Sequence, residues 1–201
     1  MQNIGGDSPT NGAKNFIENS TPFIVSVTIE GVSEYLYHRW NNEAVKAKAE
    51  SAKGSKTRTS DDLETYVYRD AEGFLCVPSE HLRMSLVYAA KYEKDPRSPR
   101  KSAMDLYKAG LIVLTKLASV GKKDWDFEDR RRVVIQRNAI TRSRPALNIG
   151  WKCSFDIQVL LPEYISYHQL HKVLSNAGKL VGIGDFRPSY GRFNIVEYKI
   201  I

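Results

Sequence analysis

A chain of 201 residues, of which 42% are hydrophobic, is long enough to form one domain with a sizeable core, or one domain carrying a large insertion. Its 30 basic and 23 acidic residues leave a net charge of +7, which favours anionic partners such as nucleic acid or an acidic membrane face. The sequence has no run of about eighteen apolar residues, so it predicts no transmembrane helix, and we expect no membrane partner.

The N-terminal residues and the two cysteines bear on the location and the redox state of the protein. The N-terminal residues lack the apolar segment of a secretory signal, so we expect a cytoplasmic protein. Cys76 and Cys153 each lie within an apolar, strand-like run, which predicts two small buried side chains and neither a disulfide framework nor a metal site. Residues 1–20 are polar and rich in Gly, Asn and Ser, so we expect a flexible tail before a single domain over 21–201.

The first predicted strand covers residues 23–30, where apolar and mixed side chains alternate and one face is therefore buried. Residues 31–40 continue it with aromatics that interleave with His38 and Arg39, which fits either a half-buried strand or a ligand-facing segment. Residues 41–63 have strong helix-former composition but almost no apolar stripe, so they predict a projecting charged insertion.

The middle of the chain is predicted to hold a β-hairpin and two helices. Residues 65–77 contain two strand-like runs around a turn-rich connection, which indicates the hairpin. A helix is expected to follow Pro78, with Ser79 as its capping residue. A basic stretch at 95–101 interrupts it. A shorter helix is expected next, in which Ser102 and Asp105 form an acidic variant of the capping box and Gly110 ends the turn. Residues 111–114 are then expected to form a brief buried strand.

Residues 130–144 hold six arginines and no acid. As a strand, this stretch places Arg131 and Arg137 on one face and Arg132 on the other. Two interpretations stay open: the arginines pair with the acidic residues at 124–129, or their planar guanidinium groups bind phosphate oxygens.

The C-terminal third predicts a strand, a helix and a second strand. Residues 153–161 alternate as a half-buried antiparallel strand. Ser166 and Gln169 form a capping box at the start of an amphipathic helix, and Gly178 is placed to end it in the left-handed conformation. A last strand covers 193–201, so the sequence predicts a ferredoxin-like α+β fold, an antiparallel sheet with helices on one face and a large middle insertion.

Residues 182–193, which we call the glycine loop, lie between that helix and the last strand. The loop combines glycines with arginines and aromatic rings, which suits an extended anionic ligand that carries bases. The same composition also suits a tight structural turn.

Two segments together suggest a family. Residues 76–90, a strand that ends in Val-Pro-Ser before a helix, resemble the segment that opens the first helix of the RAMP (repeat-associated mysterious protein) superfamily, and the glycine loop resembles its C-terminal glycine-rich loop. The resemblance implies a modified ferredoxin-like, RNA-recognition-motif-like fold. The layout is similar to that of CRISPR effector backbone subunits, which bind single-stranded guide RNA and stack into filaments. The chain is also similar to uncharacterised phage and prophage proteins.

These observations predict a non-enzymatic protein that binds single-stranded RNA or DNA, RNA being favoured. The resemblance further implies a homo-oligomer or a subunit of a nucleoprotein complex. We find no nucleophile elbow, phosphate-binding loop or dinucleotide fingerprint, so we expect no cofactor, metal or catalytic residue. Two alternatives are a metal-independent endoribonuclease that uses His38 with Tyr37 or a lysine, and a phage-encoded protein that binds or mimics a host complex. The predicted nucleic-acid-binding residues are Arg39, Arg97, Arg100, Lys101, Arg130, Arg131, Arg132, Arg137, Arg142, Arg144, Gly182, Gly184, Arg187, Tyr190 and Arg192.

Overall fold

The computed structural model describes residues 21–42, 46, 50, 62–135 and 138–201. The predicted tail at 1–20 lies outside the described residues, as do most of the predicted insertion at 41–63 and Arg137. Within the described ranges, no helix is long and apolar enough to cross a membrane.

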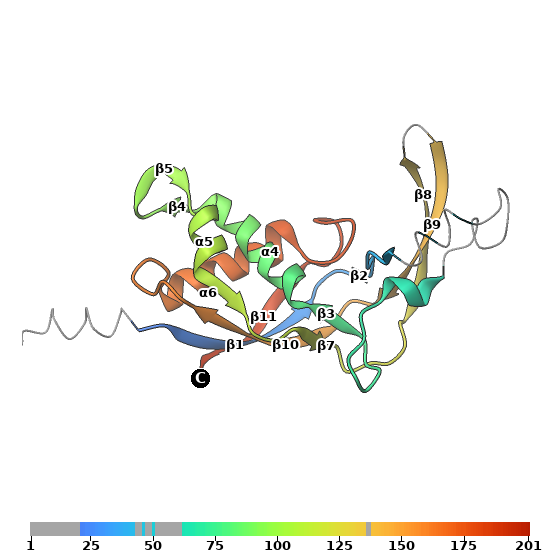
Figure 1. Cartoon of the computed structure of the whole chain (residues 1–201), viewed down its shortest axis with the longest axis horizontal. Coiled ribbons are helices and arrows are strands. Elements are labelled where there is room, and N and C mark those ends of the chain that lie inside the picture. The colour runs from blue at the N-terminus through green and yellow to red at the C-terminus, as the bar shows by residue number, and fades with distance from the viewer. Residues whose placement is uncertain (1–20, 43–45, 47–49, 51–61, 136–137) are drawn as a thin grey trace, which may run out of the picture.

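A four-stranded antiparallel sheet forms the body of the molecule, in the order β11-β1-β10-β6. The helices α4, α5 and α6 lie on one face of this sheet (Figure 1). The strands of this sheet and the helices follow one another as β-α-α-β-β-α-β, which is the ferredoxin-like order with α5 as an additional helix and confirms the predicted α+β fold. The elements in chain order are β1 (Phe23–Gly31), α4 (Ser79–Ala89), α5 (Met104–Gly110), β6 (Leu111–Val113), β10 (Lys152–Val159), α6 (Tyr167–Asn176) and β11 (Phe193–Ile200).

The two central strands form where the sequence alternates. In β1 the buried side chains are Val25, Val27 and Ile29, and the residues between them are partly exposed. In β10 every second residue from Cys153 to Val159 is buried in the same way. Because side chains of a strand point alternately to its two faces, this pattern puts one face of each strand against the helices and leaves the other towards solvent.

Of the three predicted helix starts, the structure confirms the one at α6 and differs at the other two. At α6 the backbone N–H of Gln169 donates to Ser166 Oγ at 3.3 Å, and that of Ser166 donates to Gln169 Oε1 at 2.8 Å, which confirms the capping box. The predicted cap at Ser79 is wrong, because β3 (Cys76–Pro78) ends on Pro78 and Ser79 is already helical. The predicted capping box at Ser102 is also wrong, because Ser102 belongs to a strand.

The predicted end of α6 at Gly178 is wrong as well. The helix continues as a π-helical turn, η3 (Ala177–Val181), and the residue with positive φ is Gly182, at +72°. Gly178 instead lies against Phe193, where an added Cβ would collide with the carbonyl oxygen of that residue. The glycine at 178 is therefore explained by close packing, and the turn is made four residues later.

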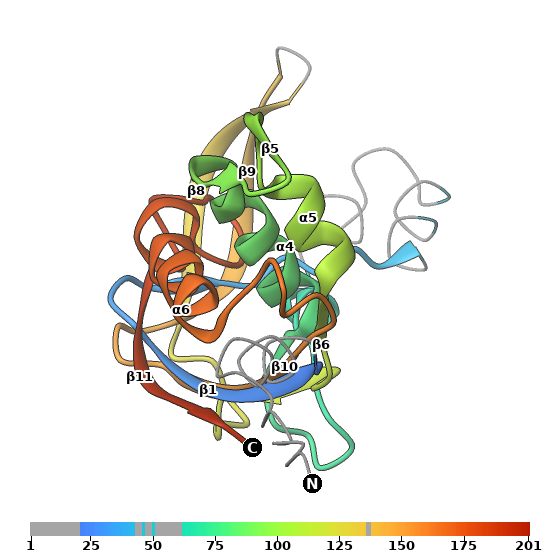
Figure 2. The same cartoon turned by 90° about the vertical axis from the view of Figure 1, so that its left-hand side faces the viewer.

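A second, three-stranded sheet, in the order β2-β9-β8, projects from the body (Figures 1 and 2). It consists of β2 (Tyr35–Leu36), β8 (Phe127–Ile135) and β9 (Asn138–Leu147). The arginine-rich stretch at 130–144 is therefore two antiparallel strands and not one.

Two short two-stranded sheets, one of them a hairpin, and two 3-10 turns complete the described part of the chain. The predicted hairpin at 65–77 is reduced to one bridge, Arg69 to Leu75, because its first part forms the 3-10 turn η1 (Leu63–Tyr66) and β3 pairs with β7 (Leu117–Ser119). The basic stretch at 95–101 forms the hairpin of β4 (Lys94–Asp95) and β5 (Ser98–Ser102), after the turn η2 (Ala90–Tyr92).

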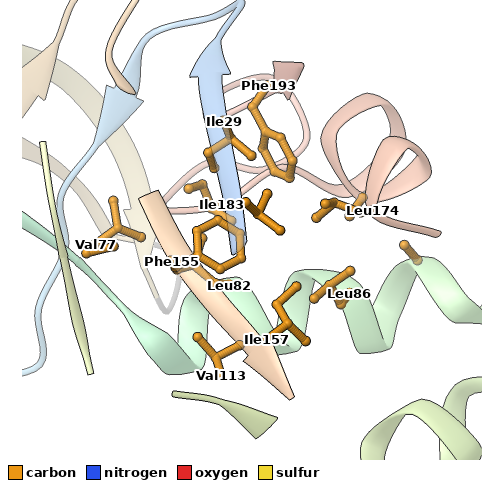
Figure 3. Close-up of a cluster of buried hydrophobic side chains, with 14 of the residues drawn as sticks. Ile29, Val77, Leu82, Leu86, Val113, Phe155, Ile157, Leu174, Ile183 and Phe193 are labelled. Carbon is orange, nitrogen blue, oxygen red and sulfur yellow. The ribbon is translucent and has the colours of Figure 1, made fainter. Parts of the chain in front are cut away.

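The core lies between the four-stranded sheet and the helices. Figure 3 shows side chains of β1, β10 and α4 pointing toward one another, with Ile183 and Phe193 among them. Since Ile183 is fully buried, the core fixes the start of the glycine loop. Both cysteines are buried and free, and burial raises the pKa of Cys76 to about 11 and that of Cys153 to about 12, so both thiols stay protonated at neutral pH.

Candidate nucleic-acid interface

The β8–β9 hairpin divides the predicted arginines between two faces. Arg130 and Arg132 are exposed and lie opposite small polar residues of β9. Arg131 lies on the other face, opposite Arg142 and next to Arg144, and these three are half-buried or buried. The alternation of a strand therefore separates arginines that solvent can reach from arginines that pack against the protein.

Arg131 is enclosed by an acid and two aromatic rings. Its guanidinium carbon lies 4.8 Å from the Phe186 ring centroid and 4.7 Å from that of Tyr190. Asp129 accepts two hydrogen bonds from it, one of them at 2.6 Å, and the Tyr190 hydroxyl accepts a third at 2.7 Å. The hydrogen bonds with Asp129 and Tyr190 raise the pKa of Arg131. This side chain joins the hairpin to the glycine loop.

Arg144 is buried, with 7% of its surface exposed. Its Nε donates to the Asp185 carboxylate, and its guanidinium carbon lies 4.5 Å from the Phe186 ring centroid. His38 Nδ1 lies 3.3 Å from the same carboxylate. Burial alone would raise the pKa of Asp185, but the hydrogen bond with His38 and the charge of Arg144 hold it well below its usual range.

Arg144 is thus placed to hold the hairpin against the glycine loop. Because it is buried, it is not placed to contact a ligand, and this corrects the prediction that it belongs to the binding surface. Its Nη1 is buried and lacks a hydrogen-bond partner within the described residues. We call the side chains that bind the hairpin to the glycine loop the arginine–aromatic cluster: Asp129, Arg131, Arg144, Asp185, Phe186 and Tyr190.

The glycines of the loop serve backbone geometry. Gly182 and Gly184 have φ of +72° and +81°, a region that favours glycine. A Cβ at Gly184 would come within 2.7 Å of the Tyr35 ring and 2.8 Å of the Leu36 carbonyl oxygen. Phe186, which is not glycine, also has a positive φ of +52°, and such a conformation persists only where surrounding contacts hold it, here those of the two arginines on its ring.

Other predicted cations of this region are exposed. Arg39, Arg187 and Arg192 are open to solvent. The Arg39 guanidinium lies 5.6 Å from the Tyr68 ring centroid, and Arg192 Nε donates to the Pro188 carbonyl at 2.7 Å. Arg187 and Arg192 lie close to residues of the arginine–aromatic cluster in the chain, and Arg39 follows His38, which contacts Asp185 of the cluster.

The structure does not bring the β4–β5 hairpin to this surface. Arg100 and Lys101 are exposed there, but the hairpin lies at the other end of the long axis from β8 and β9 (Figure 1). Arg97 is paired with Asp95 at 2.8 Å, and this hydrogen bond lowers the pKa of Asp95 to about 2. The predicted basic residues therefore form two separate groups.

The aromatic side chains near the basic ones differ in accessibility. Tyr35 and Tyr37 are fully buried, and the Tyr35 ring packs against Tyr37 at 4.7 Å and Trp151 at 5.4 Å between ring centroids. Of the two alternatives left open for residues 31–40, the structure therefore favours a buried strand at Tyr35 and Tyr37 over a ligand-facing segment. Trp40 is 71% exposed, with its Nε1 donating to Asn42 Oδ1 at 2.6 Å, and it offers an open ring.

Sequence reasoning missed Asp185, whose partner Arg144 lies 41 residues away in the chain. No local pattern marks such a pair. His168 and His171 lie three residues apart on α6, and both are exposed. In the ranges that the structure describes, no group of three or more His, Cys, Asp or Glu side chains is arranged to hold a metal ion.

Comparison with known proteins supports the fold. No protein-family model matches the sequence, and no curated protein matches it. Among solved structures, a chain from the cryo-EM structure of the Type III-B Cmr-beta bound to cognate target RNA is similar, with a TM-score of 0.56 and 10% sequence identity. The match covers 95% of this chain but only 64% of that chain. At this identity the likeness shows the fold alone.

Proposed function

We propose that this chain is a non-enzymatic protein that binds single-stranded nucleic acid, with RNA as the preferred ligand, as a subunit of a nucleoprotein complex. The observation that carries the proposal is the exposed face of β8, where Arg130 and Arg132 stand free of the contacts that hold Arg131 and Arg144. The described residues show no ion pair at either side chain. The similar solved structure is bound to target RNA, which agrees with this choice of ligand.

The exposed arginines would contact phosphates, because their forked guanidinium groups match phosphate oxygens. Trp40, with its exposed ring, would stack on a base, and stacking tolerates any base sequence. Such a surface binds without sequence preference and with strong dependence on salt. Assembly of several copies along one strand is part of the proposal and rests on the family resemblance.

The test compares two pairs of substitutions that remove the same charge from opposite ends of the molecule. We expect Arg130→Ala with Arg132→Ala to weaken binding to single-stranded RNA and to reduce the slope of log affinity against log salt by about 1.4, at about 0.7 per phosphate contact. The control pair, Arg100→Ala with Lys101→Ala on β5, is expected to change both much less. Fluorescence anisotropy with RNA, DNA and duplex at several salt concentrations measures this.

Equal losses in the two pairs would show a general effect of net charge and contradict the proposed surface. Both pairs are exposed, so neither should change the free energy of unfolding by more than about 0.5 kcal/mol. Thermal unfolding of each variant checks that a loss of binding is not a loss of fold.

One observation favours a second candidate, the endoribonuclease. His38 is 47% exposed and lies 3.3 Å from Asp185, an arrangement in which a carboxylate orients an imidazole for proton transfer. Tyr37, the partner considered from the sequence, is fully buried and is not placed to assist at the surface. Incubation with end-labelled RNA decides: product bands that disappear in His38→Ala would replace the non-enzymatic proposal.

A further inference from the structure

A hollow of about 480 Å³ lies on the other side of the glycine loop, between the loop and the end of α4. Its lining residues come from two segments that are far apart in the sequence. The first supplies Tyr88 and Lys91, at the end of α4 and in η2, and the second supplies Leu180 in η3 and Phe186, Arg187 and Pro188 in the loop. Its volume is within the range of about 300–1,000 Å³ that is usual for pockets of small ligands.

The charges around this hollow favour an anion. Lys91 and Arg187 are exposed, and no described acid forms an ion pair with either of them. The Lys91 ammonium lies 4.8 Å from the Tyr92 ring centroid. Asp185 also lines the hollow, but its carboxylate is already bound by Arg144 and His38. Two cations are therefore available to a ligand, and the one acid is neutralised.

The apolar part of the lining favours a flat group. Tyr88 is 42% exposed and Leu180 is 46% exposed, although both are large and apolar in the main. Phe186 contributes a second ring, which the two arginines of the cluster hold from the side of the hairpin. Aromatic rings next to cations are the combination that binds a base together with its phosphate.

The walls are held at a fixed spacing. Ser85, which is buried in α4, donates from Oγ to the Gly182 carbonyl at 2.9 Å and so ties the helix to the start of the loop. The backbone N–H of Asp185 donates to the Leu36 carbonyl at 3.0 Å on the opposite side. A pocket that is already formed loses little entropy when a ligand enters.

We infer that this hollow is a nucleotide pocket, which takes one splayed-out nucleotide of the bound strand. The base lies against Tyr88 and Phe186, and its phosphate lies against Lys91 and Arg187. This inference rests on the proposed function, because the nucleotide belongs to the same single strand. An acidic peptide would use the cations but not the rings, and inorganic phosphate would use neither ring.

The first experiment titrates the whole chain with AMP, adenosine and ribose 5-phosphate by calorimetry. We expect AMP to bind with a Kd of about 1 mM or tighter, and each of the two fragments to bind at least about tenfold more weakly. Tyr88→Ala is expected to weaken AMP binding about tenfold, as loss of one stacking ring does. The matched control is Tyr92→Ala, since Tyr92 is 52% exposed one turn further on and does not line the hollow.

The second experiment crosslinks RNA that contains 4-thiouridine to the chain and identifies the modified peptides by mass spectrometry. Crosslinks at Tyr88 or Phe186 support the pocket. One outcome overturns the pocket and leaves the proposed function in place. In that outcome RNA binds as proposed but crosslinks elsewhere, and Tyr88→Ala and Lys91→Ala bind AMP and RNA as well as Tyr92→Ala does. AMP binding without any RNA binding would instead overturn the proposed function. Equal binding of ribose 5-phosphate and AMP would show a phosphate site only.

Discussion

The four-stranded sheet of the body and the three-stranded sheet that projects from it are held by different forces. The body is held by apolar side chains that three helices and four strands bury together (Figure 3). The projecting sheet has an apolar base, where Ala146 and Leu147 are buried. It meets the glycine loop through the ion pair of Arg144 with Asp185, the hydrogen bond from Arg131 to Tyr190 and three contacts between arginines and rings. We therefore expect the free energy of unfolding to depend on side-chain volume in the body and on charge in the arginine–aromatic cluster.

The largest effect is expected in the body. Phe155 is 2% exposed at the centre of β10, and Phe155→Ala should lower the free energy of unfolding by about 3–5 kcal/mol, because it leaves a cavity that the core cannot fill. Urea denaturation measures the change. Ile112→Ala on β6 is the control, since Ile112 is 42% exposed and should cost much less. A similar small loss for both variants would mean that the body is not the stable unit.

A smaller effect is expected in the cluster, where charge matters more than volume. Asp185→Asn removes the partner of a buried guanidinium and should cost about 1.5–3 kcal/mol, as loss of a hydrogen bond to a charged group does. Arg144→Met should cost less, because it removes the charge that would be left without a partner. If Arg144→Met is the more damaging substitution, apolar packing and not charge holds the hairpin.

The smallest effect concerns pH. The pKa of Asp185 in the folded chain is well below its usual range, so its contribution to stability is present above the unfolded pKa of about 3.9 and is lost as the pH falls. Between pH 5 and pH 3 the loss from this group should be about 1 kcal/mol. Because other acids titrate in the same window, the measurement is the difference between wild type and Asp185→Asn. Parallel pH profiles would contradict the depressed pKa.

The same comparison explains what the sequence could predict. Features that depend on neighbours in the chain were found: the alternation of β1 and β10, the capping box at Ser166 and Gln169, and the order of strands and helices. The ferredoxin-like arrangement follows from these local patterns, because few topologies satisfy them.

What could not be predicted depends on contacts across the chain. Six arginines between 130 and 144 look alike in the sequence. The register of β8 with β9 and the distant Asp185 decide which of the described ones pack against the protein and which are exposed to solvent. Gly178 looks like a helix end until the approach of Phe193 is known. The aromatics at 31–40 fit a ligand-facing segment in the sequence, but Tyr35 and Tyr37 are fully buried, and the glycine loop and Trp151 pack on Tyr35.

The π-helical turn η3 has one more consequence. The Gly182 amide donates to the Ala177 carbonyl at 2.8 Å, five residues back, so the turn contains one residue more than an α-helical turn. Removing one residue between 177 and 181 would restore α-helical spacing and rotate everything that follows by about 100° around the helix axis. Ser85 and the two arginines of the cluster would then meet different parts of the loop. The number of residues in this turn therefore sets the rotation of the loop about the helix axis. We expect insertions and deletions here to be tolerated far less than substitutions.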